Sequence, residues 1–217
     1  DEVTNLDWQP PLPGEMSDIP VVHVPVEGYP ARGASEEDVL VTIVEFGDYG
    51  CPDTHSRVGM VEEVLAEHGD VVRFVYRNLD WVPGEYGPFA SRLAEASKER
   101  DAYWDAYDLI WKDFRKLEEK GRDAYLEALE LSDDQLDDYA NQADEANERN
   151  QTFADEHNLG WVPTFFVNGV PAVKASDEQF LRLVELQIAR AKQLRDKSGE
   201  TGDALYRSVV EANKKSR

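Results

Sequence analysis

The apolar residues of this chain switch from strand-like to helix-like spacing and back again, and that order leaves few folds open. Residues 40–46 form a β-branched run that predicts a buried strand. Residues 58–65 carry valine and leucine at helical spacing, and Gly69 ends the predicted helix, which begins at Pro52. Residues 71–76 return to a strand pattern. Because two strands flank one helix, they predict a right-handed βαβ unit with parallel strands.

The second half of the chain is predicted to be mostly helical. Residues 88–157 place apolar side chains three and four positions apart, which predicts three to four helices. The aromatic residues of 103–114 follow the same spacing, so we expect them in the core of this block rather than on a substrate surface. Asn168-Gly169 is a strong hairpin turn between two short strands, and Ser176 caps a final helix. The whole order predicts an α/β fold in which helices cover one mixed sheet.

The two ends of the chain are polar. Pro, Gly and acidic residues dominate the start, where residues 21–26 fit a short edge strand because Pro25 argues against a central one. The predicted organisation is an extended arm over 1–35, one α/β domain over 36–87 and 158–195, a helical insertion over 88–157, and a polar tail over 196–217 with one weak helical pattern.

The charge and cysteine content exclude several classes of partner and site. The 217 residues hold 23 basic and 45 acidic side chains, a net charge of −22, so nucleic acid and anionic lipid are poor partners. No apolar run is long enough for membrane insertion, and no signal peptide is visible, although a mature form would look the same. One cysteine and four histidines without ligand spacing predict no structural metal.

The only cysteine, Cys51, lies where the first strand gives way to a helix. A helix start favours the thiolate, which is the nucleophilic form of the side chain. Thr54 and His55, three and four residues on, can place a hydroxyl and an imidazole near the sulfur, whereas the carboxylate of Asp53 opposes ionisation. The alternative is that Cys51 is a small buried residue with no chemical role.

A second segment, "GWVPTFFVNGVP", places Pro163 directly before an apolar strand. A cis peptide bond at this position would mark a tight turn. Such a turn would expose the backbone of Val162 to an extended peptide or to glutathione. We also expect Trp81 and Trp161 to lie near Cys51 and to contact substrate.

Three motifs in this order resemble the DsbA-like branch of the thioredoxin superfamily over about residues 20–195. They are "VTIVEFGDYGCPDT", "VVRFVYRNL" and "VPTFFVNG", with the helical block between the last two. The resemblance implies a thioredoxin-like mixed sheet flanked by helices, with an inserted all-helical subdomain.

The resemblance also implies roles for single residues. In that family the first motif reads C-P-x-C, so Cys51 matches the attacking cysteine and Pro52 the residue after it. Thr54 stands where the resolving cysteine should be. Pro163 matches the family's cis-proline, and Glu45 matches a partly buried acid that assists proton transfer at the thiol. The alternative for Glu45 is a carboxylate exposed at the end of a strand.

Disulfide exchange is the chemistry that the resemblance implies, and Thr54 removes the internal resolving thiol. We therefore expect a monothiol oxidoreductase or isomerase that forms a mixed disulfide with a thiol- or disulfide-containing protein. An external thiol would resolve it, with glutathione as a co-substrate and no bound cofactor. Threonine here could also be a substitution made to trap that intermediate.

Two other functions remain open at this point. One is a non-catalytic peptide-binding or chaperone-like module, and the other is an enzyme like the kappa-type glutathione transferases, which resemble this layout. Most relatives of the DsbA-like branch act outside the cytoplasm, so the resemblance implies a periplasmic or extracytoplasmic site of action. A lone cysteine is also compatible with the cytoplasm.

Overall fold

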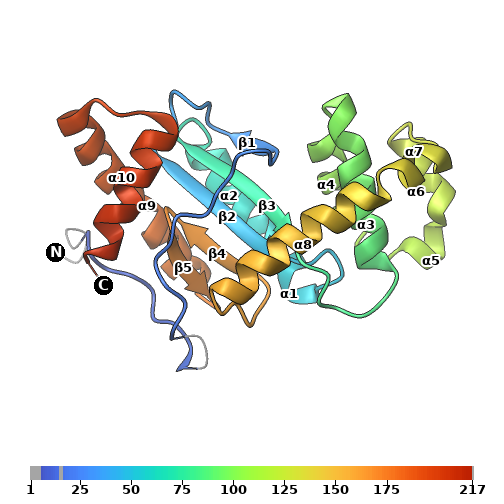
Figure 1. Cartoon of the computed structure of the whole chain (residues 1–217), viewed down its shortest axis with the longest axis horizontal. Helices are drawn as coiled ribbons and strands as arrows, with labels where there is room; N and C mark the ends of the chain where they lie inside the picture. The colour runs from blue at the N-terminus through green and yellow to red at the C-terminus, as the bar shows by residue number, and fades with distance from the viewer. Residues whose placement is uncertain (1–5, 15–16, 217) are drawn as a thin grey trace. The chain divides into compact units, whose positions relative to one another are not determined.

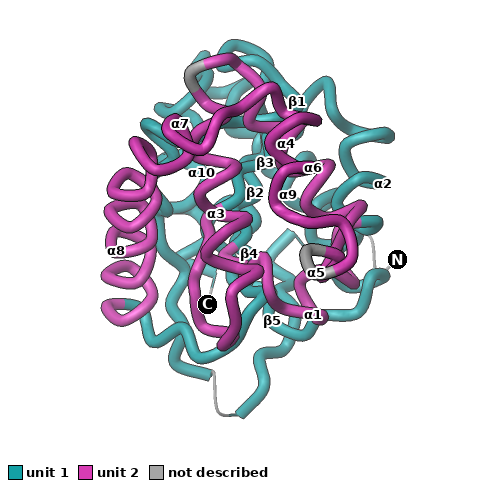
Figure 2. Tube along the Cα trace, turned by 90° about the vertical axis from the view of Figure 1, so that its right-hand side faces the viewer, with its two compact units in different colours: residues 1–45, 59–76, 157–217 teal, residues 46–58, 77–156 magenta. Residues whose placement is uncertain are grey.

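The computed structural model describes residues 6–14 and 17–216 (Figure 1). Parts of the predicted arm, residues 1–5 and 15–16, and residue 217 of the predicted tail lie outside the described residues. The chain divides into two compact units, which Figure 2 distinguishes by colour. As far as they are described, residues 1–45, 59–76 and 157–217 form unit 1, and residues 46–58 and 77–156 form unit 2.

From β2 to α9 the strands and helices follow one another in the order that the sequence predicts, with shorter helices in the middle of the chain. The elements are β1 (Ala31–Gly33), β2 (Val41–Gly47), α1 (Pro52–His55), α2 (Val58–His68), β3 (Val72–Asn78), α3 (Tyr86–Ser97), the 3₁₀ helix η3 (Lys98–Arg100), α4 (Tyr103–Lys112), α5 (Leu117–Lys120), α6 (Arg122–Ala128), α7 (Asp133–Asp138), α8 (Ala140–Glu156), β4 (Thr164–Val167), β5 (Val170–Val173), α9 (Asp177–Ser198) and α10 (Gly202–Lys214).

One five-stranded sheet organises the chain, with strands in the order β1-β3-β2-β4-β5. β1 pairs antiparallel with β3, and β4 pairs antiparallel with β5. Every residue of β2 and β3 is buried, as expected for central strands that are covered on both faces. The two strands begin and end one or two residues later than the predicted 40–46 and 71–76. The predicted fold class, a mixed sheet with flanking helices, is confirmed.

The Asn168-Gly169 turn has the predicted hairpin conformation. Both residues have positive φ, 45° and 76°, which a two-residue I′ turn requires. The Asn168 side chain also links the hairpin to β2, because its Oδ1 accepts from Thr42 N at 3.0 Å and its Nδ2 donates to Leu40 O at 3.0 Å. This one side chain therefore fixes the turn and its position beside the central strand.

The start of the chain was predicted to hold an edge strand at 21–26, and that prediction was wrong. These residues form no strand; the edge strand is β1. Their backbone groups bind partners far away in the sequence instead. Val22 N donates to Gly169 O at 3.0 Å, and Val24 pairs with the hydroxyl of Tyr206. Pro25 supplies no N–H, so a regular ladder could not continue through it.

The predicted polar tail over 196–217 was also wrong, because these residues finish α9 and form α10. One face of α10 is buried and carries Leu205, Tyr206, Val209 and Val210. The helix packs against α9, as Figure 1 shows. Charged residues on the other face lower the mean hydropathy of this stretch, so its composition alone does not reveal the amphipathic helix.

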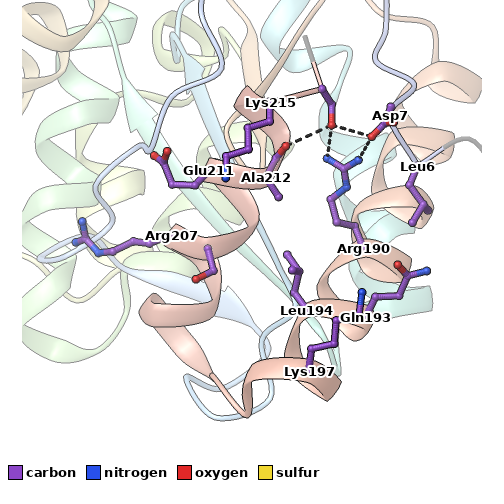
Figure 3. A pocket seen from close by; sticks show the side chains of 12 residues that line it. Leu6, Asp7, Arg190, Gln193, Leu194, Lys197, Arg207, Glu211, Ala212 and Lys215 are labelled. Carbon is purple, nitrogen blue, oxygen red and sulfur yellow. Dashed lines mark hydrogen bonds and ion pairs between the residues drawn. The ribbon is translucent and has the colours of Figure 1, made fainter.

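A buried arginine on α9 joins both ends of unit 1. Arg190 donates to Asn213 Oδ1 at 2.6 Å and to Ser216 Oγ at 3.2 Å. It also forms an ion pair with Asp7, which Figure 3 shows. Asn213, which is buried on α10, donates in turn to Asn168 O at 2.9 Å. Residues near the start and the end of the chain are thus held by one hydrogen-bonded cluster.

Unit 2 is built around the aromatic residues of α4. Tyr103, Tyr107 and Trp111 are buried, as predicted, whereas Trp104 and Phe114 are half-buried. Tyr49, next to the turn of Cys51, lies 6.4 Å from Tyr107 and 5.3 Å from Trp111 between ring centroids.

Across the described chain, every helix is too short or too polar to cross a bilayer.

Candidate active site at the Cys51 turn

Cys51 is the N-cap residue of α1, and Pro52 takes the first helical position. The backbone of Cys51 is extended, with φ −90° and ψ 122°, and its carbonyl accepts from His55 N at 3.0 Å. The residue is 7% exposed. The helix that was predicted to run from Pro52 to Gly69 is interrupted after His55, so α1 has four residues. A helix this short has a smaller macrodipole than the long helix that the sequence predicted.

Ser56, the residue directly after α1, lies where the predicted helix is interrupted. Ser56 Oγ donates to Asp53 O at 2.7 Å. A side chain that binds the backbone locally competes with the helical hydrogen bonds, so the second helix, α2, begins afresh at Val58.

A buried aspartate, Asp48, organises the turn before Cys51. Its Oδ1 accepts from Gly50 N at 2.6 Å, and its Oδ2 accepts from Trp81 N at 2.8 Å and Val82 N at 2.6 Å. Its own carbonyl accepts from Cys51 N at 2.9 Å. One carboxylate therefore joins the Cys51 turn to the segment after β3.

Burial raises the pKa of Asp48, and the three backbone hydrogen bonds oppose that rise. The sequence analysis did not single out this residue. The available signal was an Asp two residues before a Gly, which is typical of a turn closed by the aspartate side chain. Trp81 was expected near Cys51, but its hydrogen bond to Asp48 and that of Val82 carry no such signal, because both residues lie more than thirty positions away.

Thr54 lies three residues after Cys51 and is buried. Its Oγ1 accepts from Asp48 N at 3.3 Å, so the hydroxyl helps to close the turn. This contact gives the threonine a structural role that a single sequence does not reveal. Its predicted hydrogen bond to the Cys51 sulfur stays a prediction.

His55 is exposed at the end of α1 and stacks on two aromatic rings, one at the end of α4 and one just after that helix. Its ring centroid is 4.4 Å from that of Phe114 with the planes 17° apart, and 6.0 Å from that of Trp111 with the planes 22° apart. Arg115, the next residue along, donates from Nη2 to Gly50 O at 2.7 Å. The sequence predicted neither contact, because α4 is about fifty residues away from the turn.

Glu45, the predicted proton-transfer acid, lies in β2 and is 2% exposed. The alternative of a solvent-exposed carboxylate at the strand end is therefore wrong. Its role in proton transfer stays a prediction.

The second predicted segment lies in unit 1, just before β4. The Val162-Pro163 peptide bond is cis, as predicted. Val162 is 8% exposed, and the Trp161 ring lies 3.4 Å from Lys174 Nζ. Thr164 Oγ1 donates to Trp161 O at 2.7 Å, which holds this loop against the start of the strand.

The structure thus brings part of the predicted site together. Cys51, Pro52, Thr54 and His55 share one turn of unit 2, and Asp48 and Arg115 join them there. The remaining predicted residues, Glu45 and 161–163, belong to unit 1. Within the described part of the chain, no cluster of three or more His, Cys, Asp or Glu side chains is arranged to hold a metal ion.

Comparison with known structures gives the same fold. The thioredoxin-like oxidoreductase from Silicibacter pomeroyi DSS-3 is similar with a TM-score of 0.64 and 24% identity, over 77% of this chain and 94% of that one. The thiol-disulfide exchange protein alpha-DsbA2 from Wolbachia pipientis is similar with a TM-score of 0.60 and 17% identity, over 72% of this chain and 84% of that one. Both likenesses concern the fold, and they confirm the predicted DsbA-like architecture.

Sequence comparison adds a curated relative and a family. The Na(+)/H(+) antiporter NhaA 3 from Salinispora tropica is 30% identical over 149 residues, or 67% of this chain. This chain spans 23% of that antiporter's length. The family model described as "Thioredoxin" matches residues 30–185. Because that match covers more than half of the sequence, the chain belongs to the thioredoxin family, with the fold of its DsbA-like thiol–disulfide oxidoreductases.

Proposed function

We propose that this protein is a monothiol thiol–disulfide oxidoreductase or isomerase that works through Cys51. The observation that carries the proposal is the position of Cys51, which caps α1 directly after a central strand of a thioredoxin-family fold. Thr54 fills the position of a resolving cysteine, and Cys51 is the only cysteine in the sequence. The protein can therefore start a disulfide exchange, but it cannot finish one by forming its own disulfide.

The reaction takes two exchanges. The Cys51 thiolate attacks one sulfur of a substrate disulfide, forms a mixed disulfide and releases the other substrate sulfur as a thiolate. An external thiolate then attacks the substrate sulfur of the mixed disulfide. That attack makes a new disulfide and returns Cys51 as a thiolate. The number of disulfide bonds is unchanged, so the protein reshuffles bonds or transfers them to a thiol such as glutathione.

The other predicted residues have supporting roles in this proposal. Glu45 is a buried carboxyl group, which suits an acceptor for the proton that Cys51 loses. The turn of Val162 and Pro163 would pair with an extended substrate peptide. We place the reaction outside the cytoplasm, because disulfides in substrate proteins persist there.

The proposal predicts a mixed disulfide that accumulates. Incubation with oxidised glutathione should give one glutathione adduct per chain, located on Cys51 by mass spectrometry of the intact protein and its peptides. The adduct should persist until a thiol is added, since the chain holds no second cysteine. Cys51→Ser should form none. An adduct that forms on urea-unfolded protein but not on folded protein would contradict the proposal.

A non-catalytic peptide-binding module is the second candidate, and the low exposure of Cys51, 7%, favours it. A buried thiol reacts slowly, whereas binding of a peptide by the surrounding surface does not need a reactive thiol. The two functions differ in the Cys51→Ser variant. A binding module keeps its full affinity for an unfolded, cysteine-free peptide, and the exchange enzyme loses all transfer of disulfide bonds.

A further inference from the structure

A pocket in unit 2 adjoins the residue before Cys51. Its volume is about 440 Å³, within the range of about 300–1,000 Å³ that is typical of small-molecule sites. The lining residues are Gly50, Val82, Pro83, Gly84, Glu85, Tyr86, Gly87 and Arg115. Gly50 is the immediate neighbour of Cys51, so a ligand in this pocket would lie beside the turn that carries the sulfur.

Arg115 is the only cation among the residues that line this pocket. Its φ is 58°, a left-handed conformation that is uncommon for a residue other than glycine. Its Nη2 donates to Gly50 O at 2.7 Å, which leaves most of the five guanidinium donors for a ligand. The guanidinium carbon also lies 5.3 Å from the centroid of the Phe114 ring.

Among the side chains that the structure describes, Arg115 has no carboxylate partner, although the sequence holds 45 acidic residues. The neighbouring Asp113 instead pairs with Lys116 and Lys120. In a chain with a net charge of −22, a guanidinium left without an acid partner is a local attractor for an anion.

The opposite charge on the pocket lining comes from Glu85. Its side chain is exposed and makes no capping hydrogen bond at the start of α3. No lysine or arginine of the described chain forms an ion pair with it. A pocket that offers one guanidinium and one carboxylate complements the carboxylate and ammonium groups of an amino acid.

We propose that this pocket binds the amino-acid end of a small thiol, with Arg115 on its carboxylate and Glu85 on its ammonium group. The inference rests on the proposed function, and it specifies the class of the external thiol: cysteine itself, or a small peptide thiol with a free amino-acid end. The bound thiolate attacks the substrate sulfur of the Cys51 mixed disulfide and leaves joined to it. Cys51 departs as a thiolate, and the proton of the incoming thiol passes to the buffer.

Cysteine and cysteamine test this assignment, because they share the thiol and the ammonium group and differ by the carboxylate. Cys51 is first blocked as a methyl disulfide with a methanethiosulfonate reagent. Intact mass spectrometry then follows the rate at which each thiol removes the methylthio group from Cys51. In the native protein we expect cysteine to remove the blocking group about five- to tenfold faster than cysteamine does, because a charge-assisted contact at a partly exposed site has an effect of about this size.

The variant Arg115→Asn should remove that advantage, because asparagine tolerates positive φ but carries no charge. The cysteine-to-cysteamine ratio is the readout, since damage to the turn would slow both thiols together. Arg149→Gln, an exposed arginine of α8 outside the pocket lining, is the matched control and should keep the native ratio. Glu85→Gln should weaken the preference for cysteine over 3-mercaptopropionate, which lacks the ammonium group.

A second measurement does not depend on the chemistry of Cys51. S-methylcysteine cannot react, and its titration followed by NMR should perturb the amides of Gly84 and Gly87, with affinity about tenfold lower in Arg115→Asn. Unchanged ratios together with no perturbation of these amides overturn the inference. Binding of S-methylcysteine by a protein whose Cys51 resists all modification would support the pocket and contradict the proposed exchange reaction.

Discussion

Thr54→Cys should convert the monothiol protein into a dithiol oxidant. The new thiol stands three residues after Cys51, at the position from which the C-P-x-C motif resolves a mixed disulfide. Well-oriented intramolecular groups reach effective concentrations of about 10⁵ M, so even a poorly aligned thiol at about 1 M would exceed about 1 mM of external thiol by about 1,000-fold. The lifetime of the glutathione adduct should fall by at least that factor, with an internal disulfide left behind.

Rapid acid quenching and intact mass spectrometry measure this lifetime, since the glutathione adduct and the internal disulfide differ in mass. Thr54→Ser is the matched control: it keeps the hydroxyl that accepts from Asp48 N, supplies no thiol and should retain the long-lived adduct. Cys51→Ser with Thr54→Cys tests whether the new thiol reacts alone. An adduct of the Thr54→Cys protein that is as persistent as the native adduct would mean that Thr54 does not occupy the resolving position.

Asp48→Ala should cause the largest loss of stability of any single change at the site. The substitution leaves three backbone N–H groups, those of Gly50, Trp81 and Val82, without their shared acceptor. Each unsatisfied donor costs about 1–3 kcal/mol, and relief from burying the carboxylate offsets part of the sum, so we expect a loss of about 3–5 kcal/mol in the free energy of unfolding. Urea unfolding measures it.

The matched control for this change is Asp70→Ala, an exposed aspartate in a turn, which should change the free energy of unfolding by less than about 0.5 kcal/mol. Asp48→Ala should also change the rate of adduct formation at Cys51, because the lost carboxylate oxygen accepts from the N–H of Gly50, the residue before Cys51. A loss of stability as small as that of the control would show that water or a rearranged turn replaces the carboxylate.

The stability difference between the native protein and the Asp48→Asn variant should depend on pH, and the burial of Asp48 sets the sign of that dependence. Burial raises the pKa of Asp48, so folding favours its protonated form. The contribution of Asp48 is therefore fully present below its unfolded pKa, and it is lost as the pH rises through the higher folded pKa. Asparagine does not titrate, so the native protein should gain stability relative to Asp48→Asn as the pH falls from about 7 to about 4.5. A constant difference would contradict the assignment.

Short-range patterns were enough to predict the scaffold. The strands around Cys51, the hairpin at Asn168-Gly169 and the aromatic core of α4 each follow from residues that are close in the sequence, because backbone geometry sets periods of two for strands and 3.6 for helices. The cis bond at Pro163 followed from the resemblance, since its local sequence is compatible with either isomer.

The same local reading failed wherever burial depends on distant partners. Residues 196–217 look polar by composition, yet α10 buries one face against α9. Residues 21–26 look like a strand, yet they bind Gly169 and Tyr206 rather than a neighbouring strand. The contacts of residues 21–26 join segments more than a hundred positions apart, and the burial of α10 depends on how the helix packs against α9.

By itself, the sequence determined the order of elements, the single thiol and its place after a strand, because these depend on residue types and short spacings. Only the tertiary structure decided what surrounds that thiol. Asp48 meets Trp81 across 33 positions, and Arg115 meets Gly50 across 65. Such contacts form because folding brings distant backbone donors, acceptors and charges together, and a hydrogen bond over that separation leaves no periodic trace in the sequence.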